Sequence, residues 1–144
     1  MLDRTDVAYA YLDLDYLWWF QVSGIDHAAA KEVLWANLAL LIDNYTAKGV
    51  DHFMLAWTAE DEIDLEDLMR VMSMPLRVVK LSVPIEVIRH RLAASPTTDR
   101  QLDLSNTESL LAENAQSGFT SVVVANDRPL PEVAHEILQL LNWA

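Results

Sequence analysis

The feature that most constrains the fold is the alternation of short β-rich apolar runs with longer segments of helical periodicity. The β-rich runs predict strands at 7–13, 51–57, 76–81 and 120–125. The helical patterns predict helices at 28–48, 62–72, 84–94, 105–117 and 132–143. Strands joined through helices usually form a parallel sheet with right-handed crossovers and helices on its faces. We therefore predict one α/β domain over 1–144, with three α/β/α layers and a mostly parallel sheet. The first strand is nearly all apolar, which is typical of a strand buried on both faces.

Composition excludes several classes of protein. The 144 residues are 52% hydrophobic with three glycines, so a folded core is expected. A net charge of −12 argues against nucleic-acid binding, which needs basic patches, but a small anion could still bind at a local arginine cluster. The absence of cysteine excludes disulfides and thiol chemistry. No apolar run approaches the roughly 20 residues of a membrane span, so we expect a cytoplasmic protein without membrane contact.

In parallel α/β sheets, ligands bind at the carboxyl ends of the strands. The segments that follow the predicted strands there are Asp13 with Asp15, 57–61, Ser82 and 126–128.

Asp13 and Asp15 lie two residues apart, hence on one side of an extended chain. Such a pair can hold Mg²⁺, with Asp13 as the metal ligand, accept a proton from a hydroxyl group, or bind a sugar-like diol. The alternative is a solvated strand end, or Asp15 as the cap of the next helix.

Four aromatic residues follow this pair, and they could line a substrate pocket or simply belong to the core. They are Tyr16, Trp18, Trp19 and Phe20, of which Tyr16 and Trp19 are the candidate substrate contacts.

Two further groups could bind a nucleotide. Arg89, Arg91 and Arg100 could grip phosphate through their planar guanidinium groups, or lie on an exposed helix face with Arg89 paired to Glu86. The segment Asn126-Asp-Arg128-Pro129 could cradle a purine ring, or form an ordinary turn. The four histidines show no metal-ligand spacing.

The order of elements resembles P-loop kinases of the shikimate-kinase and adenylate-kinase type, more particularly small actinobacterial ATP-binding kinase-like proteins. The resemblance rests on Tyr11-Leu-Asp-Leu-Asp-Tyr-Leu17, Asn37-Leu, Phe53-Met-Leu-Ala, the stretch Val78–Leu92, Val122-Val-Val-Ala-Asn and Glu132-Val-Ala-His-Glu-Ile-Leu. It implies ATP and Mg²⁺ as cofactors and a small hydroxylated acceptor.

The resemblance also implies roles for the candidate residues. Asp13 and Asp15 would be the catalytic and acceptor-binding carboxylates, with Asp13 as base or Mg²⁺ ligand. Three arginines would neutralise the transferred phosphoryl group, namely Arg89, Arg91 and Arg100. The loop with Asn126, Arg128 and Pro129 would contact adenine.

The chain lacks the Gly-x-x-x-x-Gly-Lys-Ser/Thr loop of such kinases, whose backbone and lysine hold the phosphates. We expect either that this segment lies upstream of Met1, or that the chain is a relic that pairs its own strands or forms a homodimer through an exposed sheet edge. A third possibility is that the resemblance misleads. In the first two cases, this polypeptide alone should transfer phosphate poorly.

Two other functions fit the residues. One is a haloacid-dehalogenase-like phosphatase with Asp13 as nucleophile, Asp15 as acid and base, and Ser82 as its serine, although the late Asp-Asp pair of that family is missing. The other is a non-enzymatic module that binds a nucleotide weakly or a protein partner.

Overall fold

The computed structural model describes residues 7–20, 23–57, 62–94 and 122–143. Two compact units divide the chain, Met1–Leu76 and Arg77–Ala144, and each is treated by itself. Both described strand pairs are parallel and alternate with helices, so the predicted α/β class is confirmed. The prediction of one domain stays a prediction.

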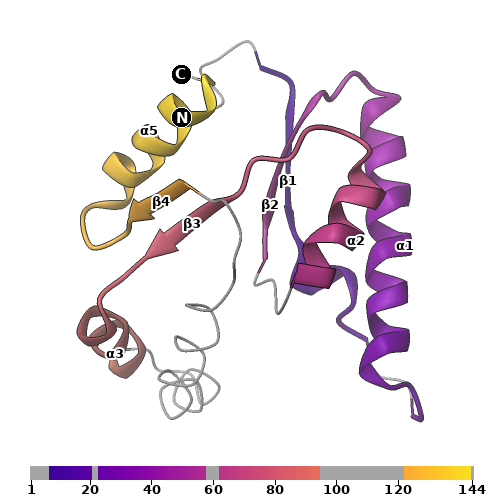
Figure 1. Cartoon of the computed structure of the whole chain (residues 1–144), viewed down its shortest axis with the longest axis horizontal. Helices are drawn as coiled ribbons and strands as arrows, with labels where there is room; N and C mark the ends of the chain where they lie inside the picture. Colours follow the sequence, from indigo (N-terminus) through magenta and orange to yellow (C-terminus); the bar gives the residue numbers. More distant parts are fainter. Residues whose placement is uncertain (1–6, 21–22, 58–61, 95–121, 144) are drawn as a thin grey trace. The chain divides into compact units, whose positions relative to one another are not determined.

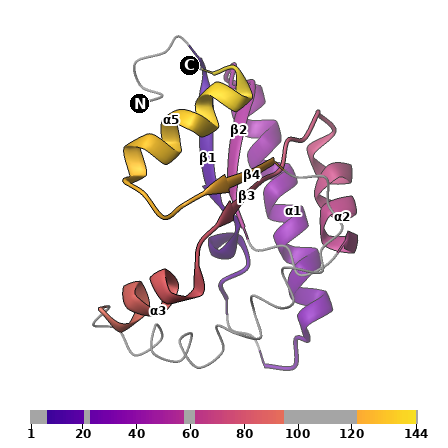
Figure 2. The same cartoon turned by 60° about the vertical axis from the view of Figure 1, so that its left-hand side comes forward.

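The first unit is a β-α-β arrangement followed by a second helix (Figure 1). Its elements are β1 (Tyr9–Asp13), the 3₁₀ turn η2 (Leu14–Leu17), α1 (His27–Thr46), β2 (His52–Ala56) and α2 (Glu62–Met72). The strands run parallel in a register from Tyr9 opposite His52 to Asp13 opposite Ala56, so their carboxyl ends are level. Helices α1 and α2 lie on the same side of the two strands in both views (Figures 1 and 2).

The core of this unit lies between the strands and the two helices. It consists of buried leucine, isoleucine and methionine side chains, namely Leu12, Leu14, Leu34, Leu38, Ile42, Leu68 and Met72. On α1, the buried residues recur at the helical period, which is why that segment folds as a helix against the sheet.

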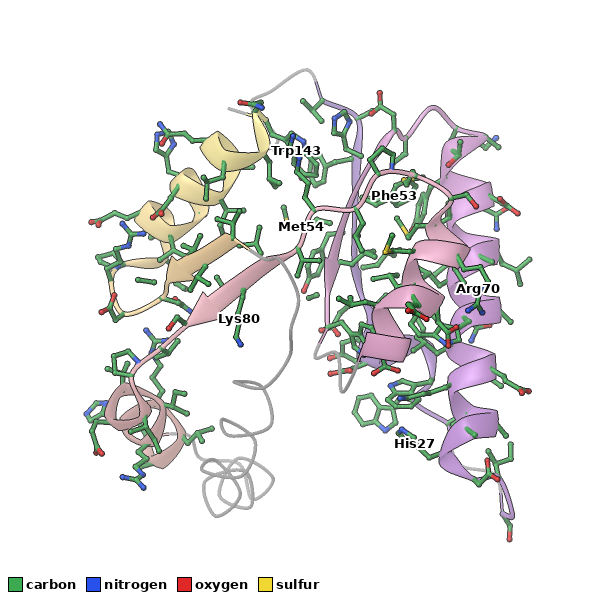
Figure 3. The ribbon with its side chains drawn as sticks, viewed as in Figure 1. His27, Phe53, Met54, Arg70, Lys80 and Trp143 are labelled. Atoms are coloured by element: carbon green, nitrogen blue, oxygen red, sulfur yellow. The ribbon has the colours of Figure 1, made fainter. Side chains whose placement is uncertain are left out.

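The first strand buries one face, where two buried faces were expected. Ala10 and Leu12 are buried, whereas Tyr11 between them is 56% exposed. Phe53 of β2 points toward the helices and Met54 points to the opposite side (Figure 3). Because side chains alternate along a strand, an all-apolar run does not reveal which faces are covered; here both helices of the unit cover the same one.

Helix α1 is fixed at its start and tied to α2. Asp26 caps it by accepting a hydrogen bond of 2.9 Å from the backbone N–H of Ala29. One turn later, the Lys31 ammonium forms an ion pair of 2.7 Å with Asp64 of α2, whose side chain is only 2% exposed. A buried carboxylate needs such a partner, so this pair fixes the two helices against each other.

The second unit also contains a parallel strand pair. Its elements are β3 (Val79–Ser82), α3 (Ile85–Ala93), β4 (Val122–Ala125) and α5 (Leu130–Leu141). The register runs from Val79 opposite Val122 to Ser82 opposite Ala125. Helix α5 lies beside β4 in both views, and Val124, Val133 and Leu138 are buried (Figures 1 and 2).

The element boundaries differ from the predicted ones by a few residues. Helix α2 matches the prediction, while the strands are shorter, with β3 beginning at Val79 where residue 76 was predicted. Helix α5 begins at Leu130, two residues early, because Pro131 fits a first helical turn whose N–H groups have no partner. The predicted helix at 105–117 lies outside the described residues. Within the described residues, no helix combines the length and apolar character needed to cross a membrane.

Candidate functional site

The two predicted carboxylates lie where β1 turns into η2. A carboxylate oxygen of Asp13 accepts a hydrogen bond of 3.2 Å from the backbone N–H of Asp15. Asp13 therefore caps this turn, and the alternative that Asp15 is a helix cap is wrong. Since one oxygen of Asp13 is engaged, its second oxygen is the one available to a ligand.

The pKa of Asp15 depends on its surroundings. Partial desolvation is the larger cause that raises the pKa of Asp15, and the negative charge of Asp13 adds to it. Because its pKa is raised, the Asp15 carboxylate holds a proton more readily than an ordinary aspartate does. Asp13 accepts a hydrogen bond from the backbone of the turn, whereas Asp15 is open to solvent.

The turn that carries the pair is anchored on both sides. Leu14, between the two carboxylates, is buried in the core. Beyond them, the Asn37 side-chain amide of α1 donates a hydrogen bond of 2.6 Å to the backbone carbonyl of Leu17. Sequence reasoning gave Asn37 no role in the site, because the hydrogen bond joins residues 20 positions apart and leaves no local pattern.

The four aromatic residues after Asp15 divide into two groups. Trp18 packs against the core and meets the His27 ring edge-on at 5.2 Å, so the core alternative is correct for it. His27 is the first residue of α1 (Figure 3). Tyr16 and Trp19, in contrast, are 67% and 79% exposed, and their ring centroids lie 5.6 Å apart at an interplanar angle of 44°. These two rings form an exposed aromatic surface on the segment that directly follows Asp15.

A second aromatic pair follows β2. Trp57 meets Trp35 of α1 edge-on, with ring centroids 5.3 Å apart. The indole Nε1 of Trp35 is buried without a hydrogen-bond partner. Trp57 was predicted at this edge from its place after a strand, whereas Trp35 was missed because its helical spacing signals only burial. The neighbouring candidates at 58–61 lie outside the described residues.

In the second unit, one of the predicted arginines contacts another candidate residue. Arg91 of α3 donates a hydrogen bond of 2.9 Å to the backbone carbonyl of Asn126, which follows β4. Arg89 pairs with Glu86 at 2.9 Å on the same helix, as the surface alternative predicted. Arg100 lies outside the described residues. Two predicted groups, the arginine helix and the loop after β4, are thus joined through Arg91.

The loop after β4 presents polar atoms that lack partners. The Asn126 side-chain oxygen and the Arg128 Nε are buried without a hydrogen bond. One terminal nitrogen of Arg128 is engaged, because it forms an ion pair with Glu136 of α5. One hydrogen-bond acceptor, on Asn126, and one donor, on Arg128, therefore lack partners near the start of α5, whose N-cap is Pro129.

The carboxylate oxygens of Asp13 and Asp15 suit one kind of metal site. Among the described residues, no group of three or more His, Asp or Glu side chains could hold a metal ion. Mg²⁺ in phosphoryl-transfer sites usually takes one or two carboxylates, with water and substrate phosphates as its other ligands. Asp13 and Asp15 suit that partial ligand set, and they do not suit a metal site built of protein groups alone.

Comparison with known proteins identifies the fold. No protein-family model matches the chain, and no curated sequence matches it significantly. Among solved structures, an unliganded sugar kinase from Janibacter sp. HTCC2649 is similar, with a TM-score of 0.60 at 18% identity. The match covers 99% of this chain and 83% of that one. The chain therefore has a kinase-like α/β fold, which agrees with the resemblance to kinases at the level of fold.

Proposed function

We propose that this protein binds ATP and a small hydroxylated acceptor, and that it acts in phosphoryl transfer between them. The observation that carries the proposal is the Asp13–Asp15 pair, held on an anchored turn at the carboxyl end of a parallel strand. In α/β folds this edge is where ligands bind. The kinase-like fold supports the choice of reaction.

In the first unit, Asp15 is the proposed base and Asp13 its partner. When an acceptor hydroxyl attacks the terminal phosphorus of ATP, its oxygen forms the new P–O bond and the bond to the ADP oxygen breaks. The hydroxyl proton passes to Asp15, whose raised pKa supports this role. The second oxygen of Asp13 would hold Mg²⁺ or a second acceptor hydroxyl. Mg²⁺ would supply charge neutralisation on the phosphates.

In the second unit, the loop after β4 is the proposed nucleotide contact. The unpartnered oxygen of Asn126 could accept a hydrogen bond from the adenine amino group, and the Arg128 Nε could donate to a ring nitrogen. Pro129 would contact the face of the ring. Arg91 would add positive charge, while Arg89 and Arg100 stay candidates for the phosphates.

Turnover is expected to be slow for this polypeptide alone. Its 144 residues contain no Gly-x-x-x-x-Gly-Lys-Ser/Thr motif, so nothing in this sequence matches the loop that holds phosphates in P-loop kinases. Binding of Mg·ATP is therefore the primary test.

The experiment is a calorimetric titration with Mg·ATP, backed by thermal shift. We expect binding that Asn126→Ala and Arg128→Ala each weaken about tenfold, since one hydrogen bond to a buried group is worth about 1–1.5 kcal/mol. Arg70→Ala is the control, because Arg70 belongs to the first unit, where it pairs with Asp67 on α2. No heat and no stabilisation with millimolar Mg·ATP would reject the nucleotide role.

The phosphatase remains the second candidate, because Asp13 and Asp15 keep the Asp-x-Asp spacing that such enzymes use. Metal-dependent hydrolysis of an aryl phosphate without ATP, abolished by Asp13→Asn, would favour it over a kinase. A protein that binds Mg·ATP but catalyses neither reaction would be the non-enzymatic module.

A further inference from the structure

We propose that the acceptor bound at the Asp13–Asp15 pair is a hydroxylated ring that carries a positive charge, an amino sugar or aminocyclitol, stacked on Tyr16 and Trp19. The inference rests on the proposed function in one respect: it takes this edge of the first unit as the acceptor site. It adds the chemical class of the acceptor and the residues that select it.

The first observation is the exposure of two adjoining aromatic rings. Tyr16 and Trp19 keep most of their surface in solvent, although Leu14 and Trp18 on the same segment pack into the core. Exposed ring faces beside hydrogen-bonding groups suit a ligand with one apolar face and a polar rim. A sugar ring has that form, since its C–H groups can lie on an aromatic face while its hydroxyls reach Asp15.

The second observation is the sign of the charge around the pair. The sequence up to Leu76 contains 14 Asp and Glu residues against 4 Lys and Arg residues. Of the basic residues that the structure describes in this unit, Lys31 is held by Asp64 and Arg70 by Asp67. Lys48 follows the last turn of α1, at the end opposite the site. Within the described residues, no basic side chain pairs with Asp13 or Asp15.

The affinity of this site for an acceptor should therefore depend on the sign of the acceptor's charge. A sugar acid would meet two carboxylates that have no basic partner among the described residues, whereas an ammonium group would be attracted to both. The same cation can lie over the face of Trp19, the aromatic ring that binds cations best.

Three pyranoses that differ in charge test the inference: glucosamine, glucose and glucuronate, titrated in slightly acidic buffer with tryptophan fluorescence and calorimetry as readouts. We expect glucosamine to bind about tenfold more tightly than glucose, as a cation–π contact with one added charge pair implies, and glucuronate not to bind. Equal binding of all three, preference for glucuronate, or no binding of any would overturn the proposal.

Variants assign the effect to residues. Trp19→Ala should weaken glucosamine binding about tenfold, and Trp19→Phe should restore most of it. Phe20→Ala is the matched control, because Phe20 is also exposed but is not in ring contact with Tyr16 in this structure. Asp15→Asn should weaken glucosamine binding more than glucose binding, and so reduce the preference for glucosamine. Circular dichroism checks that each variant is folded.

The outcome separates this inference from the proposed function. Glucosamine preference without any effect of Mg·ATP would support the acceptor class and contradict phosphoryl transfer. Transfer from Mg·ATP to glucose or glucuronate in preference to glucosamine would support phosphoryl transfer and overturn the acceptor class.

Discussion

The side-chain amide of Asn37 donates a hydrogen bond of 2.6 Å to the backbone carbonyl of Leu17. This contact joins the middle of α1 to the end of the turn that carries Asp13 and Asp15. It makes the position of the two carboxylates depend on the packing of a helix that begins ten residues after the turn.

Removing this contact should loosen the turn. Asn37→Ala is expected to lower the free energy of unfolding by about 1 kcal/mol, the usual value of one hydrogen bond. Asn44→Ala on the same helix is the control, since Asn44 is exposed. Urea unfolding of both variants checks the difference, and equal stability of the two would show that the Asn37 contact does not hold the turn.

The coupling of the two carboxylates can be measured directly. Because the pKa of Asp15 is raised in the folded protein, folding disfavours its charged form relative to its neutral form. Its contribution to stability is thus fully present below its ordinary pKa and is lost as the pH rises through the raised value. Asp15→Asn should therefore be more stable than wild type at neutral pH, and the advantage should vanish in acid.

Asp13→Asn gives an independent measure of the same coupling. It should lower the pKa of Asp15 only in part, because desolvation is the larger cause and remains. Asparagine also caps well, so the turn should persist. Carbon-detected NMR titration of the Asp15 carboxyl tests this, and an unchanged pKa would mean that Asp13 does not act on it.

The Lys31–Asp64 ion pair should be costly to break from one side. Lys31→Met leaves Asp64 charged and buried, and removing one partner of a buried pair costs about 3 kcal/mol or more. Lys48→Met, at an exposed site, should change stability little. The double variant Lys31→Met with Asp64→Leu should recover much of the loss in thermal unfolding; if it loses as much as the single variant, the cost lies in packing and not in charge.

The two arginines of α3 should differ in their effect on nucleotide binding. Arg91→Ala should weaken Mg·ATP several-fold, because Arg91 reaches the backbone of Asn126. Arg89→Ala is matched in chemistry and helix but pairs with Glu86, so it should leave the Kd nearly unchanged. Calorimetry measures the Kd of both variants for Mg·ATP. A larger loss of affinity in Arg89→Ala than in Arg91→Ala would reverse the proposed roles of the two arginines.

Self-association through the β3–β4 pair remains a prediction. Leu81, Val122 and Val123 are exposed on its two strands, and exposed apolar strands tend to pair with other chains. Sedimentation should show a dimer that Val123→Glu dissociates. Leu40→Glu on α1, also at an exposed leucine, should leave the dimer intact. A monomeric wild type would reject this prediction.

Three features of this protein could be predicted from its residues alone: the α/β class, the type and order of the described elements, and the place of Asp13 and Asp15 after the first strand. These follow from local periodicity, because a run of alternating or helical apolar residues can bury its surface in only a few ways. Within the described residues, strand boundaries moved by up to three positions and those of α5 by two, and proline chemistry sets where α5 starts.

Contacts between distant parts of the chain set the surroundings of each of these residues. Asp13 caps the turn while Asp15 stays open to solvent, and Trp18 packs against the core while Trp19 stays exposed. Arg91 contacts Asn126, whereas Arg89 pairs with Glu86. Neighbouring residues of the same type look alike in sequence. What separates them is which face of an element meets a partner distant along the chain, and that depends on contacts such as Asn37 with Leu17 that no local pattern records.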